Sequence, residues 1–176
     1  MSQSERVVPT AQGSKPSLRQ MNEQMVQRLL AQQAEAIADG GYGLRVLEHT
    51  GRDSAHLHRT PIGVLLRAGR PYLVCPDRTR DWPRNLLAAP RCVIHGGVQR
   101  DERCAHPVDG DEGIDVVRHY VSVVQAPWAL RAFGLSDDPA RDEVARAMPR
   151  MIVFRLEEPS HSHPVNSPTR QLEQEH

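Results

Sequence analysis

The stretch Ile62-Gly-Val-Leu-Leu-Arg-Ala-Gly-Arg-Pro-Tyr-Leu-Val-Cys75 decides the fold class of this chain. Two short apolar runs, 62–68 and 71–75, flank the turn signal Ala68-Gly-Arg70, and this pattern is typical of a β-hairpin. Strand-like runs on either side extend the pattern, at 44–49, 91–96 and 151–156, with a further candidate at 98–108. The sequence therefore predicts a core of short antiparallel strands.

Short helices are predicted between and after these strands. Asp81 is placed to cap a helix of about two turns, Pro83 is favoured in its first turn, and Pro90 ends it. Residues 110–148 also carry helical signals, with acidic residues near the starts. Within that region the β-branched stretch 121–124 fits a strand as well as a helix.

A longer helix is predicted ahead of the strands, over residues 17–39. Ser17 is a suitable N-cap, apolar residues then recur near helical spacing, and Gly40-Gly41 ends the pattern. The polar face is rich in glutamine rather than lysine. We therefore expect this helix to lie on the barrel or on a partner subunit, with peripheral association with a membrane surface as the alternative.

Together these elements predict the α+β class: an antiparallel core with an N-terminal helix and short peripheral helices, most economically closed as a small barrel. A chain of 176 residues suits one domain, which we place at 17–156. The polar, proline-containing segments 1–16 and 157–176 are predicted to be disordered tails.

The charge of the chain is zero overall but unevenly distributed. Between Arg45 and Arg100 there are ten arginines and four acidic residues, a net charge of +6, so the remainder carries −6. Because arginine pairs with phosphate and carboxylate in bidentate fashion, this excess predicts a small-molecule ligand with anionic groups. The alternative is a general preference for arginine, since Lys15 is the only lysine. Nucleic acid is disfavoured, because aromatic platforms and lysine clusters are missing.

The cysteines and the N-terminus favour a cytoplasmic location. Cys75, Cys92 and Cys104 form no metal-type pair and leave an odd thiol, as expected in a reducing compartment. The N-terminus lacks the apolar core of a signal peptide, and no apolar run reaches membrane-spanning length. We therefore expect no bound metal and no integral membrane segment.

The first candidate site is the segment from His49 to Pro61. A turn here offers backbone N–H groups, the hydroxyls of Ser54 and Thr60, and the guanidinium groups of Arg52 and Arg59. These are the components of a phosphate site without a Walker-type loop. The alternative is an ordinary β-turn with solvated arginines.

The second candidate site runs from Cys75 to Asn85. Trp82 offers a flat surface for a ring system, Asn85 is both donor and acceptor, and Arg78 adds positive charge, as do Arg80 and Arg84. A strand end followed by a loop and a helix N-terminus is favourable for an anion or a ring carbonyl. In the alternative interpretation Trp82 anchors the core and Asp81 only caps the helix.

Together the two segments resemble a known family. T-G-R-x-S-x₄-R-T-P at 50–61 and D-W-x-R-N-L at 81–86 are similar to the deazaflavin-dependent nitroreductases, a branch of the flavin/deazaflavin oxidoreductases that includes quinone reductases. The resemblance runs from about Tyr42 to Gly97, with MIVFRLEEP at 151–159 as weaker support. It implies a split β-barrel that binds coenzyme F-420 and passes hydride to a quinone, a nitro compound or an unsaturated small molecule.

Residue by residue, the resemblance implies two groups of cofactor contacts. The phosphate and acidic tail would be held by Arg52, Ser54, Arg59, Thr60 and Pro61. The deazaflavin ring would be bordered by Cys75, Pro76, Asp77, Trp82 and Asn85, with Arg78 and Asp81 completing the predicted set. The chain departs from the family pattern at Asp53, where a basic residue is usual, and at Ala55, where glycine is usual. Asp53 would repel an anionic tail unless a neighbouring arginine pairs with it.

Three further questions stay open at the level of sequence. Tyr120 is the candidate proton donor to the acceptor, and simple packing is its alternative role. FMN is the alternative cofactor, and a carrier that binds the cofactor without turnover is the alternative function. A homodimer is expected from the resemblance alone.

Overall fold

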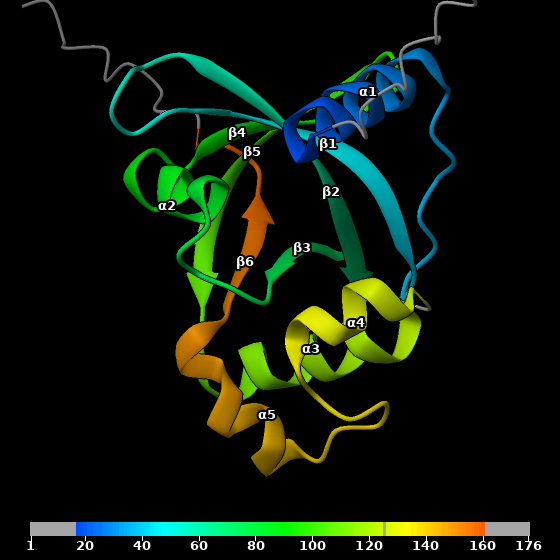
Figure 1. Ribbon diagram of the computed structural model, residues 1–176, viewed down its shortest axis with the longest axis vertical. Coiled ribbons are helices and arrows are strands. Elements are labelled where there is room, and N and C mark those ends of the chain that lie inside the picture. The colour runs from blue at the N-terminus through cyan, green and yellow to red at the C-terminus, as the bar shows by residue number, and fades with distance from the viewer. Residues whose placement is uncertain (1–16, 125, 161–176) are drawn as a thin grey trace, which may run out of the picture.

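The computed structural model describes residues 17–124 and 126–160 of the chain. Six antiparallel strands form a closed barrel in the order β1-β2-β3-β6-β5-β4 (Figure 1). Their bounds are β1 Tyr42–Thr50, β2 Leu57–Arg67, β3 Arg70–Cys75, β4 Arg91–Gly96, β5 Gln99–Val108 and β6 Ile152–Glu157. The predicted α+β class and the barrel are therefore confirmed.

The hairpin predicted at 62–75 is present as β2 and β3. Arg67 pairs with Arg70, and the two turn residues between them, Ala68 and Gly69, both have positive φ. Two adjacent residues with positive φ match the type of turn that follows the twist of a two-stranded hairpin. β2 begins at Leu57, five residues before the predicted start at 62, because it pairs with β1 along its extension.

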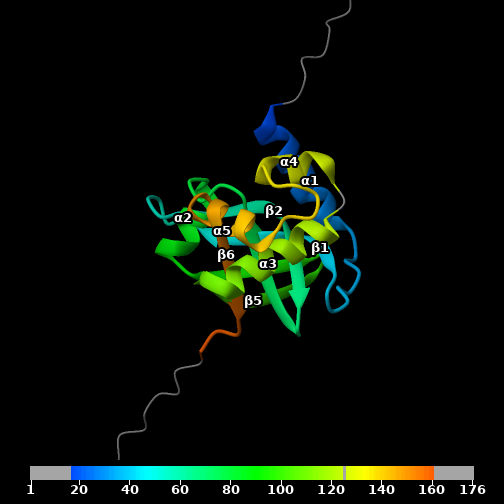
Figure 2. The ribbon, with the colours of Figure 1, turned by 90° about the horizontal axis from the view of Figure 1, so that it is seen from below.

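Two apolar clusters stabilise the barrel. Side chains inside the barrel form the first cluster, with the fully buried Leu47, Leu73 and Phe154 at its centre. The second cluster lies on the outer face of the barrel, where Leu65 and Val153 pack under helices. Those helices are α3 Gly110–Val123, α4 Pro127–Phe133 and α5 Arg141–Ala147, followed by the short 3₁₀ turn η1 Met148–Arg150. Figure 2 shows α3 and α5 in front of the strands that they cover.

The stretch 121–124, which the sequence left open, is not a strand: residues 121–123 end α3, and Val124 is its C-cap. Val121 is buried in the second cluster, and the backbone N–H of Val124 donates to the Tyr120 carbonyl at 3.0 Å. A β-branched run is tolerated here because it packs against the barrel, so tertiary contacts override the local preference.

The N-terminal helix is shorter than predicted. Helix α1 spans Leu18–Ala31 and begins with a capping box between Ser17 and Gln20. Residues 32–39 were predicted to continue the helix, but they are not helical. The side chain of Ile37 packs against the barrel core, and the guanidinium of Arg45 donates to the Glu35 carbonyl. These contacts need an irregular chain, so the predicted end at Gly40-Gly41 is wrong.

The predicted tails lie largely outside the described residues, which exclude 1–16 and 161–176. The predicted C-terminal tail starts one residue too early, since Glu157 is the last residue of β6. Across residues 17–124 and 126–160, no helix is both long and apolar enough to cross a membrane.

Candidate functional site

The candidate site lies at the end of the barrel that helix α2 covers. Helix α2, Asp81–Ala88, buries Trp82 and Leu86 among the side chains inside the barrel. The β1–β2 connection, residues 51–56, lies beside this helix (Figure 1). The structure thus brings together the two segments that the sequence singled out separately.

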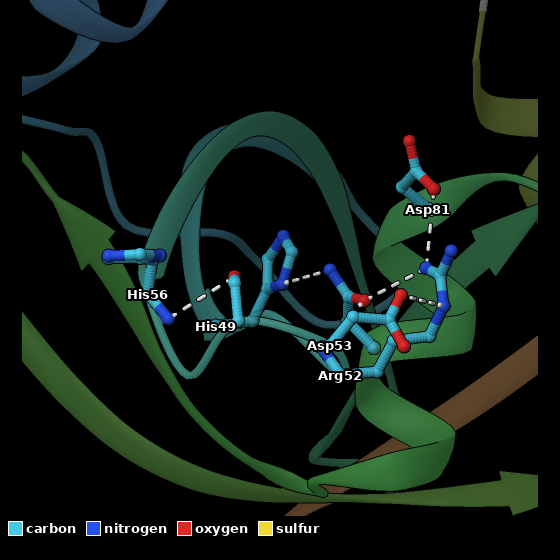
Figure 3. A network of polar contacts seen from close by, with 7 residues as sticks. His49, Arg52, Asp53, His56 and Asp81 are labelled. Carbon is cyan, nitrogen blue, oxygen red and sulfur yellow. Dashed lines mark hydrogen bonds and ion pairs between the residues drawn. The ribbon is translucent and has the colours of Figure 1, made fainter.

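Arg52 makes the contacts that join them (Figure 3). Its backbone N–H and its Nη1 donate to Asn85 Oδ1 at 3.2 and 3.1 Å. Its Nη1 also pairs with Asp81 Oδ1 at 3.2 Å, and its Nε with Asp53 Oδ2 at 3.2 Å. The two carboxylates are more than 80% exposed, and exposed ion pairs contribute little stability. These two ion pairs can therefore open at small cost.

Asn85 also links Arg52 to His49 through a further hydrogen bond of its side-chain amide. Since its Oδ1 accepts from Arg52, its Nδ2 is left to donate to His49 Nδ1, at 3.3 Å. His49 Nε2 then carries the ring proton and faces Thr60 Oγ1 at 3.4 Å. Burial lowers the pKa of His49, and the charge of the adjacent His58 lowers it further. His49 is therefore a neutral imidazole in one tautomer at neutral pH.

The loop itself is compact. Gly51 N–H donates to the His56 carbonyl at 2.8 Å, and Ala55 N–H donates to the Gly51 carbonyl at 3.2 Å. Ala55 has φ +54°, a conformation that glycine adopts more readily, which accounts for the usual glycine in the family pattern at this position. Ser54 Oγ accepts a bond from His56 N–H at 3.4 Å.

Arg59 is not part of this arrangement. Because β1 and β2 pair in register, Arg59 lies opposite Glu48, while Thr60 lies opposite Leu47 on the other face of the ladder. Arg59 binds the buried carboxylate of Glu48 through Nε and Nη2, both at 2.8 Å. The structure therefore does not bring Arg59 together with Arg52 and Thr60, because the period of the strand places it on the opposite face.

Pro61 is also a strand residue rather than the start of a strand. It pairs with Val46, and it precedes Val64, the first residue of β2 that pairs with β3. Its missing N–H therefore removes no ladder bond on the β3 side. The half-buried Pro61 contributes to the barrel wall beside Thr60.

The loop from Cys75 to Thr79 is ordered by its own side chains. Asp77 Oδ1 accepts from Thr79 N–H at 2.9 Å and from Thr79 Oγ1 at 2.6 Å, and these bonds lower the pKa of Asp77. Cys75 Sγ donates to the Asp77 carbonyl at 3.2 Å, and burial raises the pKa of this thiol. Cys75 therefore stays protonated at neutral pH. The half-buried Pro76 lies between Cys75 and Asp77 in the chain.

Three residues of the predicted cofactor-binding set have other environments. Trp82 is 7% exposed and packs against Phe154 with ring centroids 6.0 Å apart, so it is a core anchor without an open face. Arg78 binds η1: its N–H donates to the Arg150 carbonyl at 2.9 Å. Asp81 is the first residue of α2 and does not cap it, because Arg80 holds the N-cap position.

Tyr120 is not brought together with Arg52 and Asn85. It is 7% exposed in the second core cluster and meets Tyr42 edge to face, with centroids 5.6 Å apart. Tyr42 begins β1, whereas Arg52 follows the other end of that strand. Burial raises the pKa of Tyr120 well above its ordinary value, and Tyr42 adds to this effect.

The sequence interpretation missed His49 and His58 as members of the site. The two rings stack with centroids 5.7 Å apart and an interplanar angle of 21°. The signal was the hairpin register, since the two histidines lie opposite each other across the β1–β2 connection. Within the described ranges, no cluster of three or more histidine, cysteine, aspartate or glutamate residues could hold a metal ion.

Comparisons with known proteins give one family. The model of the F420H(2)-dependent quinone reductase family matches residues 18–136, more than half of the chain. No curated protein matches the sequence.

Several solved structures are similar in part. One, described as an F420-H2 dependent reductase (FDR-A), is 18% identical, with 70% of this chain and all of that chain covered and a TM-score of 0.45. Another, described as a domain-swapped dimer, is 18% identical, with 77% and 96% covered and a TM-score of 0.46. A putative pyridoxamine 5'-phosphate oxidase from Listeria innocua is 10% identical, with 80% and 94% covered and a TM-score of 0.46.

Proposed function

The chain belongs to the F420H(2)-dependent quinone reductase family and is an F-420-dependent reductase, and from this premise we propose where it holds the coenzyme. The acidic tail binds at Arg52 and Ser54, between the 51–56 loop and the N-terminal turn of α2. The ring lies toward the strand end at Cys75, Pro76 and Asp77. The observation that carries this proposal is the junction of loop and helix through Arg52 and Asn85.

The residues present fit an anionic group. Arg52 supplies a guanidinium that is 24% exposed and whose orientation Asn85 fixes. A methyl group on Gly51 would come within 2.8 Å of Ser54 Oγ, so glycine leaves room for the hydroxyl to approach the backbone. Guanidinium and hydroxyl donors grouped in this way match phosphate and carboxylate oxygens.

The protein's part in the reaction is binding and orientation. Bound in its reduced form, coenzyme F-420 supplies the hydride. Arg52 holds the tail, and the hydrogen bonds that run from Asn85 through His49 to Thr60 keep Arg52 in place. The Asp77 turn, fixed by Thr79, gives the strand end a rigid edge. Trp82 supports this end of the barrel from inside rather than stacking on a ring.

The acceptor we propose is a small quinone, a nitro compound or an unsaturated molecule. Tyr120 as proton donor stays a prediction, and its burial favours solvent as the proton source. Replacing Tyr120 by phenylalanine tests the point: turnover that is unchanged at neutral pH contradicts a role as proton donor. The proposal also includes a homodimer and a cytoplasmic location, the latter supported by the three free cysteines.

Two titrations test the function. Purified protein is titrated with F-420 and, separately, with FMN, followed by cofactor fluorescence. Saturable binding of F-420 with weak binding of FMN is the expected result. Oxidation of reduced F-420 on addition of menadione then separates an enzyme from a carrier that binds without turnover.

A charge reversal at Arg52 tests the location. Arg52→Glu is expected to abolish saturable F-420 binding, because it replaces the proposed tail contact with a repulsive one. The matched control is Arg84→Glu, which reverses an exposed arginine on the neighbouring helix. Equal losses in the two variants would indicate general attraction by charge and contradict a specific contact at Arg52.

A further inference from the structure

The face of β2 that points into the site carries a histidine. His58 pairs with His49 across the β1–β2 ladder, and directly opposed residues share a face. Thr60, two residues on, lies on that same face and contacts His49. The neighbouring Arg59 is turned to the outside of the barrel by the period of the strand.

His58 and His49 have unequal surroundings. His49 is 3% exposed and has partners at both ring nitrogens, whereas His58 is exposed. The two rings stack, so a proton on one disfavours a proton on the other. Burial already lowers the pKa of His49. His49 is therefore the neutral ring against which the exposed ring of His58 stacks.

The His58 ring lies close to the backbone of Gly51, where the 51–56 loop begins. A methyl group on Gly51 would lie 2.7 Å from His58 Nε2, as well as 2.8 Å from Ser54 Oγ. The imidazole and the hydroxyl therefore converge on the same backbone carbon, directly before Arg52. Glycine at 51 is required for this approach, although its φ is not in the left-handed region.

We propose that His58, stacked on His49, is the second cationic contact of the anion site and makes its affinity for the acidic tail of the coenzyme dependent on pH. This inference rests on the proposed function, which places the tail at Arg52. It assigns to a titratable residue the role that Arg59 cannot take from the opposite face. Affinity for the anionic ligand is then highest when His58 is protonated and falls as pH rises.

The groups that surround His58 decide whether this dependence survives. From β1 it meets His49, and α2 contributes Asp81, whose charge acts on the His49 ring. The loop contributes Arg52, Asp53 and His56. Arginine and aspartate do not titrate between about pH 6 and about pH 8, so histidine is the group that changes charge in this interval.

The experiment is a fluorescence titration with F-420 at about pH 6 and about pH 8, in wild type and two variants. For the wild type we expect affinity about fivefold or more higher at the lower pH, as a charge-assisted hydrogen bond is gained. His58→Gln should bind equally at both pH values, at the weaker level. His58→Arg should bind equally at both, at the tighter level.

The control is His56→Gln, because the His56 ring lies in the same loop but points away from Arg52 (Figure 3). It should keep the wild-type pH dependence. A pH-independent wild type, or a His58→Gln variant that retains the dependence, overturns the inference while F-420 binding still supports the proposed function. No F-420 binding by folded wild type at either pH overturns both. Thermal unfolding of each variant establishes that it is folded.

Discussion

Asn85 is the residue through which loop, helix and barrel are joined at the candidate site. Its amide accepts twice from Arg52 and donates once to His49. Asn85 is only 4% exposed, so water cannot take over its hydrogen bonds to Arg52 and His49 if the amide is removed. A buried polar group without a partner costs about 1–3 kcal/mol.

Asn85→Leu is therefore expected to lower the free energy of unfolding by about 2 kcal/mol, since it leaves Arg52 N–H and His49 Nδ1 unpaired. Urea unfolding followed by circular dichroism measures the change. Arg84→Ala, exposed on the same helix, is the control and should change stability by less than about 0.5 kcal/mol. Equal stability of Asn85→Leu and wild type would show that the amide network contributes nothing.

Asp53 competes with an anionic ligand for Arg52. Its carboxylate pairs with Arg52 Nε at 3.2 Å and is 82% exposed. Asp53→Asn removes this competitor and is expected to tighten F-420 binding by about two- to fivefold, the range of an exposed ion pair. The matched control is Asp101→Asn, which breaks another exposed pair, with Arg103 on β5. Weaker binding by Asp53→Asn would mean that Asp53 itself contacts the ligand.

At the level of elements, most strands were predictable because they are short apolar or β-branched runs bounded by turn residues, whereas β5 is largely polar. The hairpin at 62–75 and the helix before Pro90 follow from local chemistry alone. What could not be predicted is which way the side chains of residues 57–60, just before Pro61, face in β2. Only pairing with β1 shows that the strand continues to Leu57, and this continuation separates Arg59 from His58.

The irregular segment 32–39 depends on contacts that the sequence does not reveal. Alanine, glutamine and glutamate favour a helix here, but the segment crosses the β4–β5 turn at Gly97. A methyl group on Gly97 would lie 2.1 Å from the Gln32 carbonyl oxygen. A methyl group that close to the Gln32 carbonyl can be accommodated only if the β4–β5 turn or the 32–39 segment moves.

Gly97→Ala compared with Gly69→Ala isolates this contact. The two glycines have φ of +68° and +70°, but Gly69 has nothing within 4 Å of the added methyl group. Both variants suffer the backbone penalty of about 1 kcal/mol, and only Gly97→Ala adds a steric clash. We expect Gly97→Ala to lose at least about 2 kcal/mol more in urea unfolding. Equal losses would contradict the docking of 32–39 on the β4–β5 turn.

The outer face of β1 carries a second polar cluster, centred on Glu48. Arg59, His95 and Arg100 lie 2.8, 3.4 and 3.7 Å from its carboxylate. Burial alone would raise the pKa of Glu48, but the bonds and charges of these three residues outweigh burial and hold the pKa below the ordinary value of a glutamate. A lowered pKa means that ionised Glu48 stabilises the folded state above that value.

Glu48→Gln is therefore expected to be less stable than wild type at neutral pH. The difference should shrink as pH falls from about 5 to about 3, because wild-type Glu48 takes up a proton as pH passes through its lowered folded pKa. Urea midpoints across this interval measure it. A difference that stays constant with pH would mean that packing, and not the charge of Glu48, is what the substitution removes.

For the whole molecule, the zero net charge is the sum of a positive middle segment and a negative remainder. Residues 45–100, which form the site and most of the barrel, carry a net charge of +6, and the remainder carries −6. Acidic residues are placed at the first turns of α3 and α5, where they stabilise helix N-termini. Arg52 belongs to this positive segment, whereas Arg67 and Arg70 flank the β2–β3 turn.

This division predicts that salt weakens cofactor binding although the protein is neutral as a whole. Exposed charges are screened over about 8 Å at physiological ionic strength, so F-420 affinity should fall severalfold between low and high salt. A deazaflavin without the acidic tail should bind equally at both, because it lacks the charged group that Arg52 is proposed to hold. Titrations of both compounds in parallel measure the contrast. Salt dependence that is the same for the two would place the charged contact at the ring and not at Arg52.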